Sequence, residues 1–337
     1  MTAAAARLAE ATSPSVPMTT VAELPPASTS TGLVRVIEVW AVDGETIALE
    51  SAVYRDAPTI GAVAQTTLIL GEGLPGRVLA TGAPVVFSDL GAEQFRRREA
   101  AARDRLAAGV GFPVYRDGAI AAVVLLLLAE TAEGVVGAIE SWEPDAERNE
   151  LRLGTSHYAG LERFEMISRY VQFPYGSGLP GEIKVSGEPR LLTGLGRSKE
   201  FIRASGAEAD GLSVALAWPV IAYGDDLKAV LILLSAASSP LARVFQIWTE
   251  VDGQLQPQKM VSKDFRSLAE ATARGPVRKG VGLIGRVWET LHPQATSDFA
   301  GESDEVRRLI ADGGLQGAVA IPVLRGETLQ GIIALWG

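Results

Sequence analysis

The stretch Gly71-Glu-Gly-Leu-Pro-Gly-Arg-Val78 decides how this sequence is interpreted. Gly71, Gly73 and Gly76 have the spacing of a turn that binds dinucleotides, which requires a preceding strand, a long helix after the turn and an acidic residue roughly 20 positions further on. Only residues 77–80 can continue a helix before Gly82-Ala-Pro84 ends it. A pyrophosphate-binding helix therefore does not fit here.

The same stretch occurs three times in the chain. It returns as Gly176-Ser-Gly-Leu-Pro-Gly-Glu-Ile183 and as Gly280-Val-Gly-Leu-Ile-Gly-Arg-Val287. Three equal copies indicate a feature of the fold, in which glycines permit a turn with positive φ and close packing of a short helix. We therefore expect no nucleotide at these turns.

Three further markers keep their order and spacing around each glycine turn. Each unit opens with a tryptophan strand, has a Pro-containing turn after the glycines, and closes with an apolar-Pro-Val triplet. The tryptophan strands are Glu38-Val-Trp40, Glu140-Ser-Trp142 and Gln246-Ile-Trp248, and the triplets are Phe112-Pro-Val114, Trp218-Pro-Val220 and Ile321-Pro-Val323. The sequence predicts three tandem domains over residues 32–129, 135–236 and 242–337, after a disordered tail over residues 1–31.

Each unit is predicted to be α+β, with a central antiparallel sheet flanked by helices. In the first unit, strands are predicted over 34–42, 47–54, 85–88, 111–115 and 119–129, with a helix over roughly 93–108. The second unit shows a helix most clearly, because Leu161, Phe164, Ile167 and Val171 lie on one face. The apolar run 120–129 is half the roughly 20 residues needed to span a bilayer, so we interpret it as a central strand buried on both faces.

Composition excludes several classes of function. A formal charge of −9 and a pI near 5.0 argue against nucleic acid as a partner. The absence of cysteine removes disulfides, thiolate metal sites and cysteine nucleophiles, and two histidines cannot supply a metal site to each unit. Neither an export signal nor a membrane segment is predicted, so we expect a cytoplasmic protein.

These motifs together resemble the GAF domain of bacterial signalling proteins. The resemblance rests on the glycine turns, the Gly82-Ala-Pro84 type of turn, Ser88-Asp89 and Ser297-Asp298, and the apolar-Pro-Val triplets, and it departs where Thr193-Gly194 replaces Ser-Asp. It implies three tandem copies over residues 32–337, a small-molecule pocket between each sheet and its helices, and a homodimer.

Several ligand classes of this family can be excluded or made less favoured from the residue types that they require. A covalent bilin and the methionine-sulfoxide reductase activity of one branch both need cysteine, and this sequence has none. The motif of the cyclic-nucleotide branch has no counterpart between Ser88 and Asp104. Cyclic nucleotides are therefore weaker ligand candidates, although they are not excluded. Haem would depend on His157, and a single histidine there is more often a packed or surface residue, so we expect no cofactor.

Candidate ligand-binding residues each have a structural alternative. Trp40, Trp142 and Trp248 either line a pocket or pack in the core, and core packing is the simpler interpretation. Asp89 and Asp298 either bind local backbone amides or contact a ligand. Arg97, Arg203 and Arg307 either lie on solvated helix faces or offer a guanidinium group to an anion.

The second unit is compositionally distinct because it holds nine of the 21 aromatic residues. We therefore predict that, if one unit binds a ligand, it is this one, through Trp142, His157, Tyr158, Tyr170, Tyr175 and Arg203. The alternative is that these rings fill a core or an interface.

The sequence leaves two classes of function open. The joints between units are short, and no kinase, cyclase, phosphodiesterase or DNA-binding segment is visible, so any output is expected in a separate signalling protein. One hypothesis is a non-catalytic sensor of an unknown small molecule. The other is an interaction or dimerisation scaffold whose pockets are filled. No catalytic constellation recurs, so we expect no enzyme activity.

Overall fold

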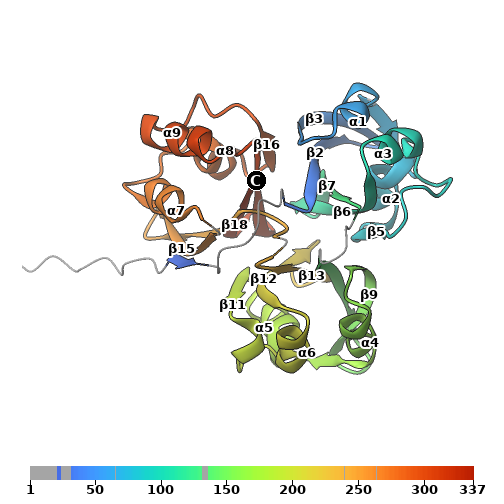
Figure 1. Cartoon of the computed structure of the whole chain (residues 1–337). Coiled ribbons are helices and arrows are strands. Elements are labelled where there is room, and N and C mark those ends of the chain that lie inside the picture. The colour runs from blue at the N-terminus through green and yellow to red at the C-terminus, as the bar shows by residue number, and fades with distance from the viewer. Residues whose placement is uncertain (1–20, 24–31, 65, 131–135, 239, 263) are drawn as a thin grey trace, which may run out of the picture.

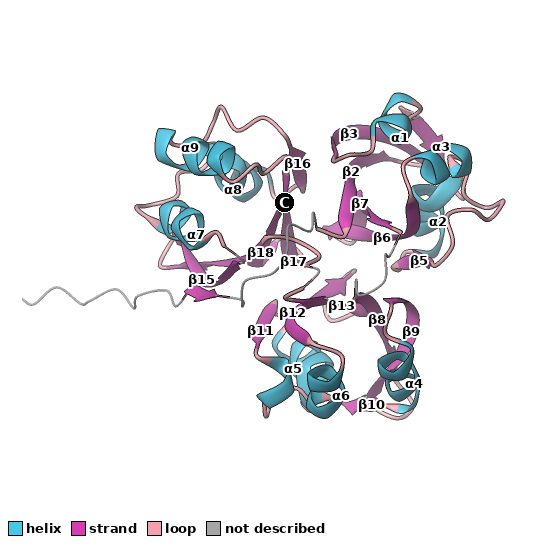
Figure 2. Ribbon diagram, in the orientation of Figure 1, coloured by secondary structure: helices cyan, strands magenta, loops and turns pink. Residues whose placement is uncertain are grey.

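The computed structural model describes all residues except 1–20, 24–31, 65, 131–135, 239 and 263. Within them, the chain forms three units, each with a six-stranded sheet. The units are arranged as a triangle, with the sheets toward the centre and the helices outside (Figures 1 and 2). The predicted α+β class with mainly antiparallel sheets is confirmed.

The first unit has the strand order β4-β3-β2-β7-β6-β5. Its strands are β2 (Val34–Asp43), β3 (Thr46–Tyr54), β4 (Thr67–Ile69), β5 (Val85–Phe87), β6 (Leu106–Arg116) and β7 (Ala119–Ala129). Its helices are α1 (Pro58–Ala62), α2 (Gly73–Thr81) and α3 (Arg98–Arg103).

The second unit repeats this order as β10-β9-β8-β13-β12-β11. Its strands are β8 (Gly137–Asp145), β9 (Glu150–Ala159), β10 (Gln172–Pro174), β11 (Arg190–Thr193), β12 (Leu212–Ile221) and β13 (Leu227–Ala236). Its helices are α4 (Glu162–Tyr170), α5 (Gly178–Ser186), the 3-10 helix η1 (Leu195–Arg197) and α6 (Ala204–Ala209).

The third unit has the order β1-β15-β14-β18-β17-β16 and differs at one edge. Its own strands are β14 (Val244–Val251), β15 (Gln254–Ser262), β16 (Gln294–Thr296), β17 (Ala318–Arg325) and β18 (Thr328–Trp336). Its helices are α7 (Arg266–Ala273), α8 (Gly282–Thr290) and α9 (Asp304–Asp312). The sixth strand is β1 (Val21–Glu23), which comes from the N-terminal segment and pairs with β15 in parallel.

Strand β1 corrects one prediction. It lies within residues 1–31, which the sequence predicted to be a disordered tail, and it adds to the third sheet by backbone pairing. A segment of three residues is too short for alternating apolar and polar residues to predict a strand, and none of the three is a turn residue. The rest of the predicted tail lies outside the described residues.

The glycine turn has the structural role that the sequence predicts. Gly71 and Gly73 have φ of 80° and 60°, and the Gly71 N–H donates to the Gly76 carbonyl at 2.8 Å. A Cβ on Gly76 would lie 2.4 Å from the Ile69 carbonyl oxygen, so only glycine fits. The other two units repeat both the positive φ values and the hydrogen bond. The turn therefore starts the short helix of each unit.

The helix predicted over residues 93–108 is much shorter. The α3 helix spans only Arg98–Arg103, and β6 already begins at Leu106. Arg105 has φ of 54°, which ends the helix, and Asp104 accepts hydrogen bonds from the Thr59 and Ile60 amides. The loop before α3 turns Phe95 into the core, where it is 3% exposed.

The apolar run at residues 120–129 forms the central strand β7, as predicted. Its alternate side chains enter two different cores, with Leu125 and Leu127 facing the unit's own helices and Val124 and Leu126 facing a core shared by all three units. Burial on both faces explains why the strand has a continuous apolar sequence.

The shared core joins the three sheets at the centre of the triangle. Strands β6, β12 and β17 contact one another there, and the three apolar-Pro-Val triplets surround a cavity of only about 20 Å³. The rings of Phe112 and Trp218 meet edge to face at 5.4 Å. The triplets are thus the contact between units.

The edges of the sheets close the triangle in a head-to-tail manner. Strand β5 contacts β9 of the second unit, β11 contacts β14 and β15 of the third, and β16 contacts β2 and β3 of the first. At the last seam, the Ala295 amide donates to Ser51 at 3.1 Å and His292 binds Glu50 at 2.6 Å. The three units therefore form a closed ring with approximate threefold symmetry.

We predict that the ring unfolds as one cooperative body. Phe112→Ala removes a ring that is 1% exposed and contacts the second unit, so we expect a loss of about 3–5 kcal/mol of unfolding free energy. Tyr170→Ala, at a ring that is 83% exposed, should change stability by less than about 0.5 kcal/mol. Urea unfolding followed by fluorescence and circular dichroism measures both, and separate transitions for the units would contradict the shared core.

Candidate functional site

The interior of the first unit, between its sheet and its helices, is built around a buried carboxylate. Glu38 on β2 is fully buried and accepts hydrogen bonds from the Trp40 indole at 3.1 Å and the Tyr54 hydroxyl at 3.0 Å. Arg97, just before α3, donates to both carboxylate oxygens of Glu38 at 2.6 and 2.9 Å. A bidentate pair of this kind satisfies a charge that water cannot reach.

The second unit repeats this arrangement in a more enclosed form. Glu140 accepts from Trp142 at 2.8 Å and from Tyr158 at 2.7 Å, and Arg203 donates to it at 2.5 and 2.8 Å. Arg203 is 3% exposed and also donates to Ser168 at 2.6 Å. Four aromatic rings surround its guanidinium group, at 4.7–5.8 Å from their centroids: Trp142, Phe164, Phe173 and Phe201.

The ionisation of nearby groups reflects this burial. The pKa values of Tyr54 and Tyr158 are raised above the ordinary value, first by burial and then by the neighbouring Glu38 and Glu140. Burial alone would lower the pKa of Arg97, but its hydrogen bonds to Glu38 raise it. Both tyrosines therefore stay protonated and act as donors to the carboxylates.

The third unit has a neutral centre in place of the ion pair. Gln246 stands where Glu38 and Glu140 stand, and its Oε1 accepts from the indoles of Trp248 at 3.3 Å and Trp336 at 3.0 Å. Its Nε2 donates to Thr272 at 2.7 Å. The N-cap position that Arg97 and Arg203 hold before α3 and α6 is occupied by Ser303 before α9, so the third unit has no arginine at this place.

The tyrosine is also replaced in the third unit. In the strand pairing, Tyr54 lies opposite Val36 and Tyr158 opposite Ala138, and the corresponding residue opposite Val244 is Ser262. The Ser262 hydroxyl is buried and has no hydrogen-bond partner among the described residues. The third interior has therefore lost the arginine, the phenol ring and the negative charge together.

A cavity of about 340 Å³ lies on this side of the third unit. Its wall comes from the end of α7, the loop after it, the start of α8 and residues 301–306. The indoles of Trp248 and Trp336 form its floor, each 1% exposed. Apolar walls with a few polar groups are the general form of a small-molecule site.

Several polar groups around the cavity already have hydrogen-bond or ion-pair partners within the protein. Glu302 accepts from the Leu283 amide at 2.6 Å, so an internal carboxylate holds the first turn of α8. Arg274 is paired with Glu305 at 2.7 Å. Thr272, Ser303 and Arg278 complete the polar part of the wall.

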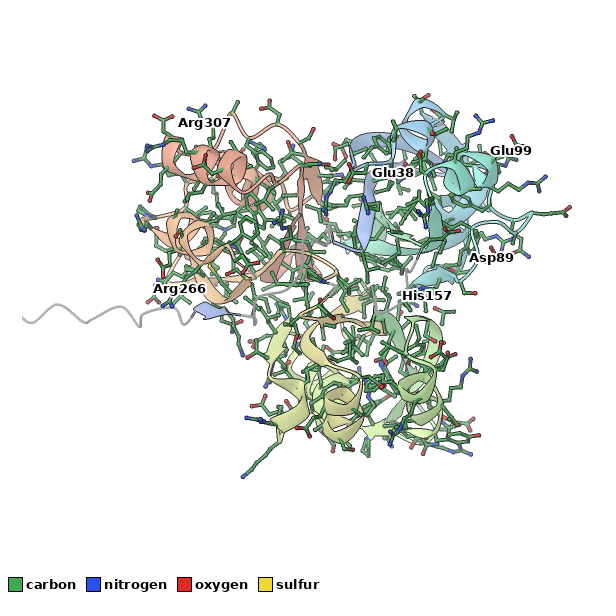
Figure 3. The ribbon with its side chains drawn as sticks, in the orientation of Figure 1. Glu38, Asp89, Glu99, His157, Arg266 and Arg307 are labelled. Carbon is green, nitrogen blue, oxygen red and sulfur yellow. The ribbon has the colours of Figure 1, made fainter. Side chains whose placement is uncertain are left out.

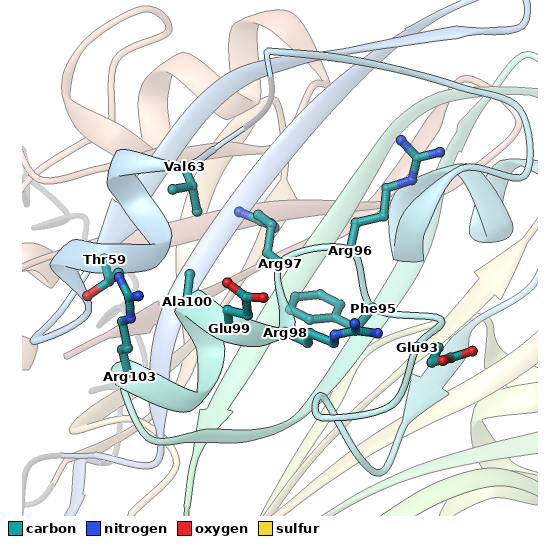
Figure 4. A pocket seen from close by; sticks show the side chains of 10 residues that line it. All are labelled: Thr59, Val63, Glu93, Phe95, Arg96, Arg97, Arg98, Glu99, Ala100 and Arg103. Carbon is teal, nitrogen blue, oxygen red and sulfur yellow. The ribbon is translucent and has the colours of Figure 1, made fainter.

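A second hollow lies on the outer surface of the first unit (Figure 4). It has a volume of about 440 Å³ and is lined by α1 and by residues 93–103, including Thr59, Arg98, Glu99 and Arg103. Arg97 also borders it but is committed to Glu38. The free charges are of both signs, so this hollow presents no strong field to an ion of either charge.

The structure brings some of the predicted site residues together and separates others. Arg97 and Arg203 point inward, as a ligand contact would require, but each is bound to an internal glutamate. Asp89 and Asp298 accept from the amides of Gly91 and Ala300, two residues on, and so hold local turns. Arg307 lies on the exposed face of α9, at the periphery in Figure 3.

Three predictions for the second unit need correction or refinement. His157 lies on the strand face opposite to Tyr158 and borders the seam with Leu33 and Leu241, not the helix-covered interior (Figure 3). Tyr170 is 83% exposed at the end of α4. Tyr175 packs at the edge of the core with Lys184 over its ring at 5.6 Å.

Sequence reasoning did not select the polar residue of the tryptophan strand. Glu38 and Glu140 each lie two residues before the tryptophan, and in a strand this spacing puts both side chains on one face. The change to Gln246 in the third copy was visible in the sequence. The polar residue two positions before each strand tryptophan is therefore the sequence signal for this buried centre.

No group of three or more histidine, aspartate or glutamate side chains in the described part of the chain is arranged to hold a metal ion. None of the helices that the structure describes is long and apolar enough to cross a membrane.

Comparison with known proteins identifies the first unit. Residues 27–140 match the family model of the GAF domain, so this part of the chain is a GAF domain. A comparison with functionally curated proteins finds no match.

Solved structures similar to this chain include GAF domains and an enzyme. The A. aeolicus nlh2 GAF domain in an inactive state has 18% identity and a TM-score of 0.25, covering 30% of this chain and 60% of that one. The free methionine-R-sulfoxide reductase of Neisseria meningitidis, in complex with its substrate, has 21% identity and a TM-score of 0.23, covering 30% and 57%. NreA of Staphylococcus aureus, mutated in its nitrate binding site, has 16% identity and a TM-score of 0.23, covering 29% and 76%.

We predict that the buried ion pair of the second unit is strongly coupled. Arg203→Met leaves Glu140 charged and unpaired and should cost about 3–5 kcal/mol of unfolding free energy. Adding Glu140→Gln should recover part of this loss, because an amide oxygen can still accept from Trp142 and Tyr158, as Gln246 accepts from two indoles. Urea unfolding of the two single variants and the double variant measures the coupling, and independent effects would contradict it.

We also predict a pH dependence at the seam between the first two units. Burial lowers the pKa of His157, against a smaller raising effect of Glu165. The stabilisation by the neutral ring is therefore present above the unfolded pKa of about 6.5 and is lost as the pH falls through the folded pKa. Urea midpoints should fall less between about pH 7 and 5 in His157→Gln than in the wild type. Equal slopes in His157→Gln and the wild type would exclude His157 as the titrating group.

Proposed function

We propose that the protein is a non-catalytic regulatory protein of three GAF-type units, in which the third unit binds a small molecule and the first two form its scaffold. The response would act on a separate signalling protein. The proposal extends the GAF assignment of residues 27–140 to the other two units. It is supported by the order of the five strands that all three sheets share and by the repeated glycine turns.

The observation that carries the proposal is the exchange at one position of the first strand. Glu38 and Glu140 bind an arginine that fills the interior of their units, whereas Gln246 needs no counter-charge. The third unit keeps a cavity of about 340 Å³ next to this residue. A site floored by two buried indoles suits a small molecule with an apolar body.

The wall of the cavity suggests a ligand that also carries a polar or anionic group. Arg278 offers a guanidinium group, and the Ser303 hydroxyl, whose oxygen accepts from the Val306 amide, can still donate. The Thr272 hydroxyl is already engaged, because it donates to the Ala269 carbonyl and accepts from Gln246. The proposal assigns no catalytic step, because Glu38, Glu140 and Glu302 are each engaged by internal donors and none is placed as a free general base.

A second candidate function rests on a specific observation. Two of the three interiors are closed by their own side chains, and the ring buries all three sheet faces in one core. A scaffold that presents surfaces to partners needs no ligand, and it would leave the third cavity without a tight occupant. The two functions are separated by whether the third cavity binds anything specifically.

We predict that filling the third cavity abolishes ligand binding. Val306 is 2% exposed on α9 and lines the cavity, so Val306→Trp places an indole in the space that a ligand would occupy. Native mass spectrometry of the freshly purified full chain should detect a small molecule that the wild type retains and Val306→Trp lacks. Titration with 1-anilinonaphthalene-8-sulfonate (ANS), an anionic aromatic probe, should show at least about tenfold weaker binding in the variant.

The matched control is Val185→Trp, at an α5 residue that is 63% exposed. It adds the same ring outside the cavity and should bind both the retained molecule and ANS like the wild type. If Val306→Trp binds like the control, the third cavity is not the ligand site. The scaffold function would then be preferred.

A further inference from the structure

The edge of the third sheet differs from the equivalent edges of the other two. In the first two units, β4 and β10 are formed by the unit's own chain and pair antiparallel with the start of β3 and β9. In the third unit, residues 276–278 lie at the equivalent place before the glycine turn but form no assigned strand with the start of β15. Instead, the N-terminal strand β1 pairs in parallel with the end of β15, at Met260–Ser262.

The paired half of β15 is also the buried half. Met260, Val261 and Ser262 have exposures of 0%, whereas most of the earlier residues of β15 are partly or fully exposed. At the equivalent ends of β3 and β9, Tyr54 and Tyr158 are only partly buried. Met260 packs in the third unit's own core and Val261 in the shared core, and β1 pairs along the edge of these same residues.

The covered edge is connected to the cavity through Gln246. The Nε2 of Gln246 contacts the sulfur of Met260 at 3.8 Å and donates to Thr272 on α7 at 2.7 Å. Strand β1 pairs with Met260 and also contacts α7. Helix α7 in turn supplies Ala271 and Thr272 to the cavity wall. One side chain therefore touches the covered strand and the wall of the cavity.

We infer that the end of β15 is a strand-binding surface, which residues 21–23 of this chain occupy, and that their docking is coupled to the third cavity. This inference rests on the proposed function. Because β1 contacts α7 and α7 supplies Ala271 and Thr272 to the cavity wall, a ligand that binds α7 in this position favours the docked state. By linkage, loss of β1 weakens ligand binding by the same factor.

The length of β1 makes this docking easy to reverse. A three-residue strand gains few ladder hydrogen bonds, and their net value is similar to the entropy lost in fixing those residues. A small change in free energy, transmitted through α7, is then enough to shift the population between the docked and free states of β1. When β1 leaves, the N–H and C=O groups at the end of β15 can pair with an extended segment of another protein.

Hydrogen exchange of the full chain tests the surface itself. Consecutive residues of a strand point their N–H groups in opposite directions, so replacing both Val21 and Ala22 by proline removes the donor that faces β15. In this double variant, amide exchange at residues 260–262 should rise at least about tenfold. The matched control carries proline at Ala5 and Ala6, outside β1, and should exchange like the wild type.

A synthetic peptide of residues 16–28 extends this test. Added to the double proline variant, it should restore the protection of residues 260–262, because the surface then takes the strand in trans. Equal exchange in the double variant and the wild type would overturn the inference, and so would raised exchange that the peptide fails to reverse.

Titration with ANS tests the coupling separately. The double proline variant should bind ANS about fivefold more weakly than the wild type, counting only the binding that Val306→Trp abolishes. If Val306→Trp abolishes the binding but the proline variant binds like the wild type, the coupling is wrong while the third cavity remains the ligand site. If Val306→Trp has no effect on ANS, the proposed function fails, and with it the coupling. The exchange experiment still decides whether residues 21–23 cover β15.

Discussion

Burial of three sheet faces in one core is the constraint on which the rest of this structure depends. Each sheet gives one face to the centre, and each ring edge rests on the next unit. A face committed to the shared core cannot vary without disturbing its two neighbours, because protein interiors are closely packed. Each unit is therefore free to differ mainly on the face that its own helices cover, and the three units do differ there.

On that face, one carboxylate decides how the interior is filled. A buried glutamate must find a cation, since an unpaired charge in an apolar interior is very costly. Arg97 and Arg203 supply it, and their side chains occupy the space between sheet and helices. An amide has no such requirement, so the third unit satisfies Gln246 with two indoles and a threonine. The cavity follows from the missing arginine and phenol side chains.

The sequence predicted the architecture well because the residues that repeat are ones that occur in few kinds of local structure. Glycines at positive φ and an apolar run on the central strand each allow few interpretations. The site was harder, since both faces of each sheet are buried and strand alternation alone cannot tell which face covers a pocket. His157 and Tyr158 show this, because adjacent residues of β9 face a seam and an interior. The prediction of a long helix over residues 93–108 failed for another reason. Phe95 and Arg97 turn inward from a loop, and not from the face of a helix.

The third unit differs from the other two in several linked places. The amide on β14, the serine at the end of β15, the serine at the N-cap of α9 and the added strand β1 all lie around one interior. Tyr54 and Tyr158 span the distance from strand end to carboxylate, and Ser262 at the same register is too short to do so. Two separate differences, at Gln246 on β14 and at Ser262 on β15, therefore lie on one pair of strands. The first removes the charge from the interior that the cavity enters, and the second removes the phenol ring beside the edge on which β1 lies.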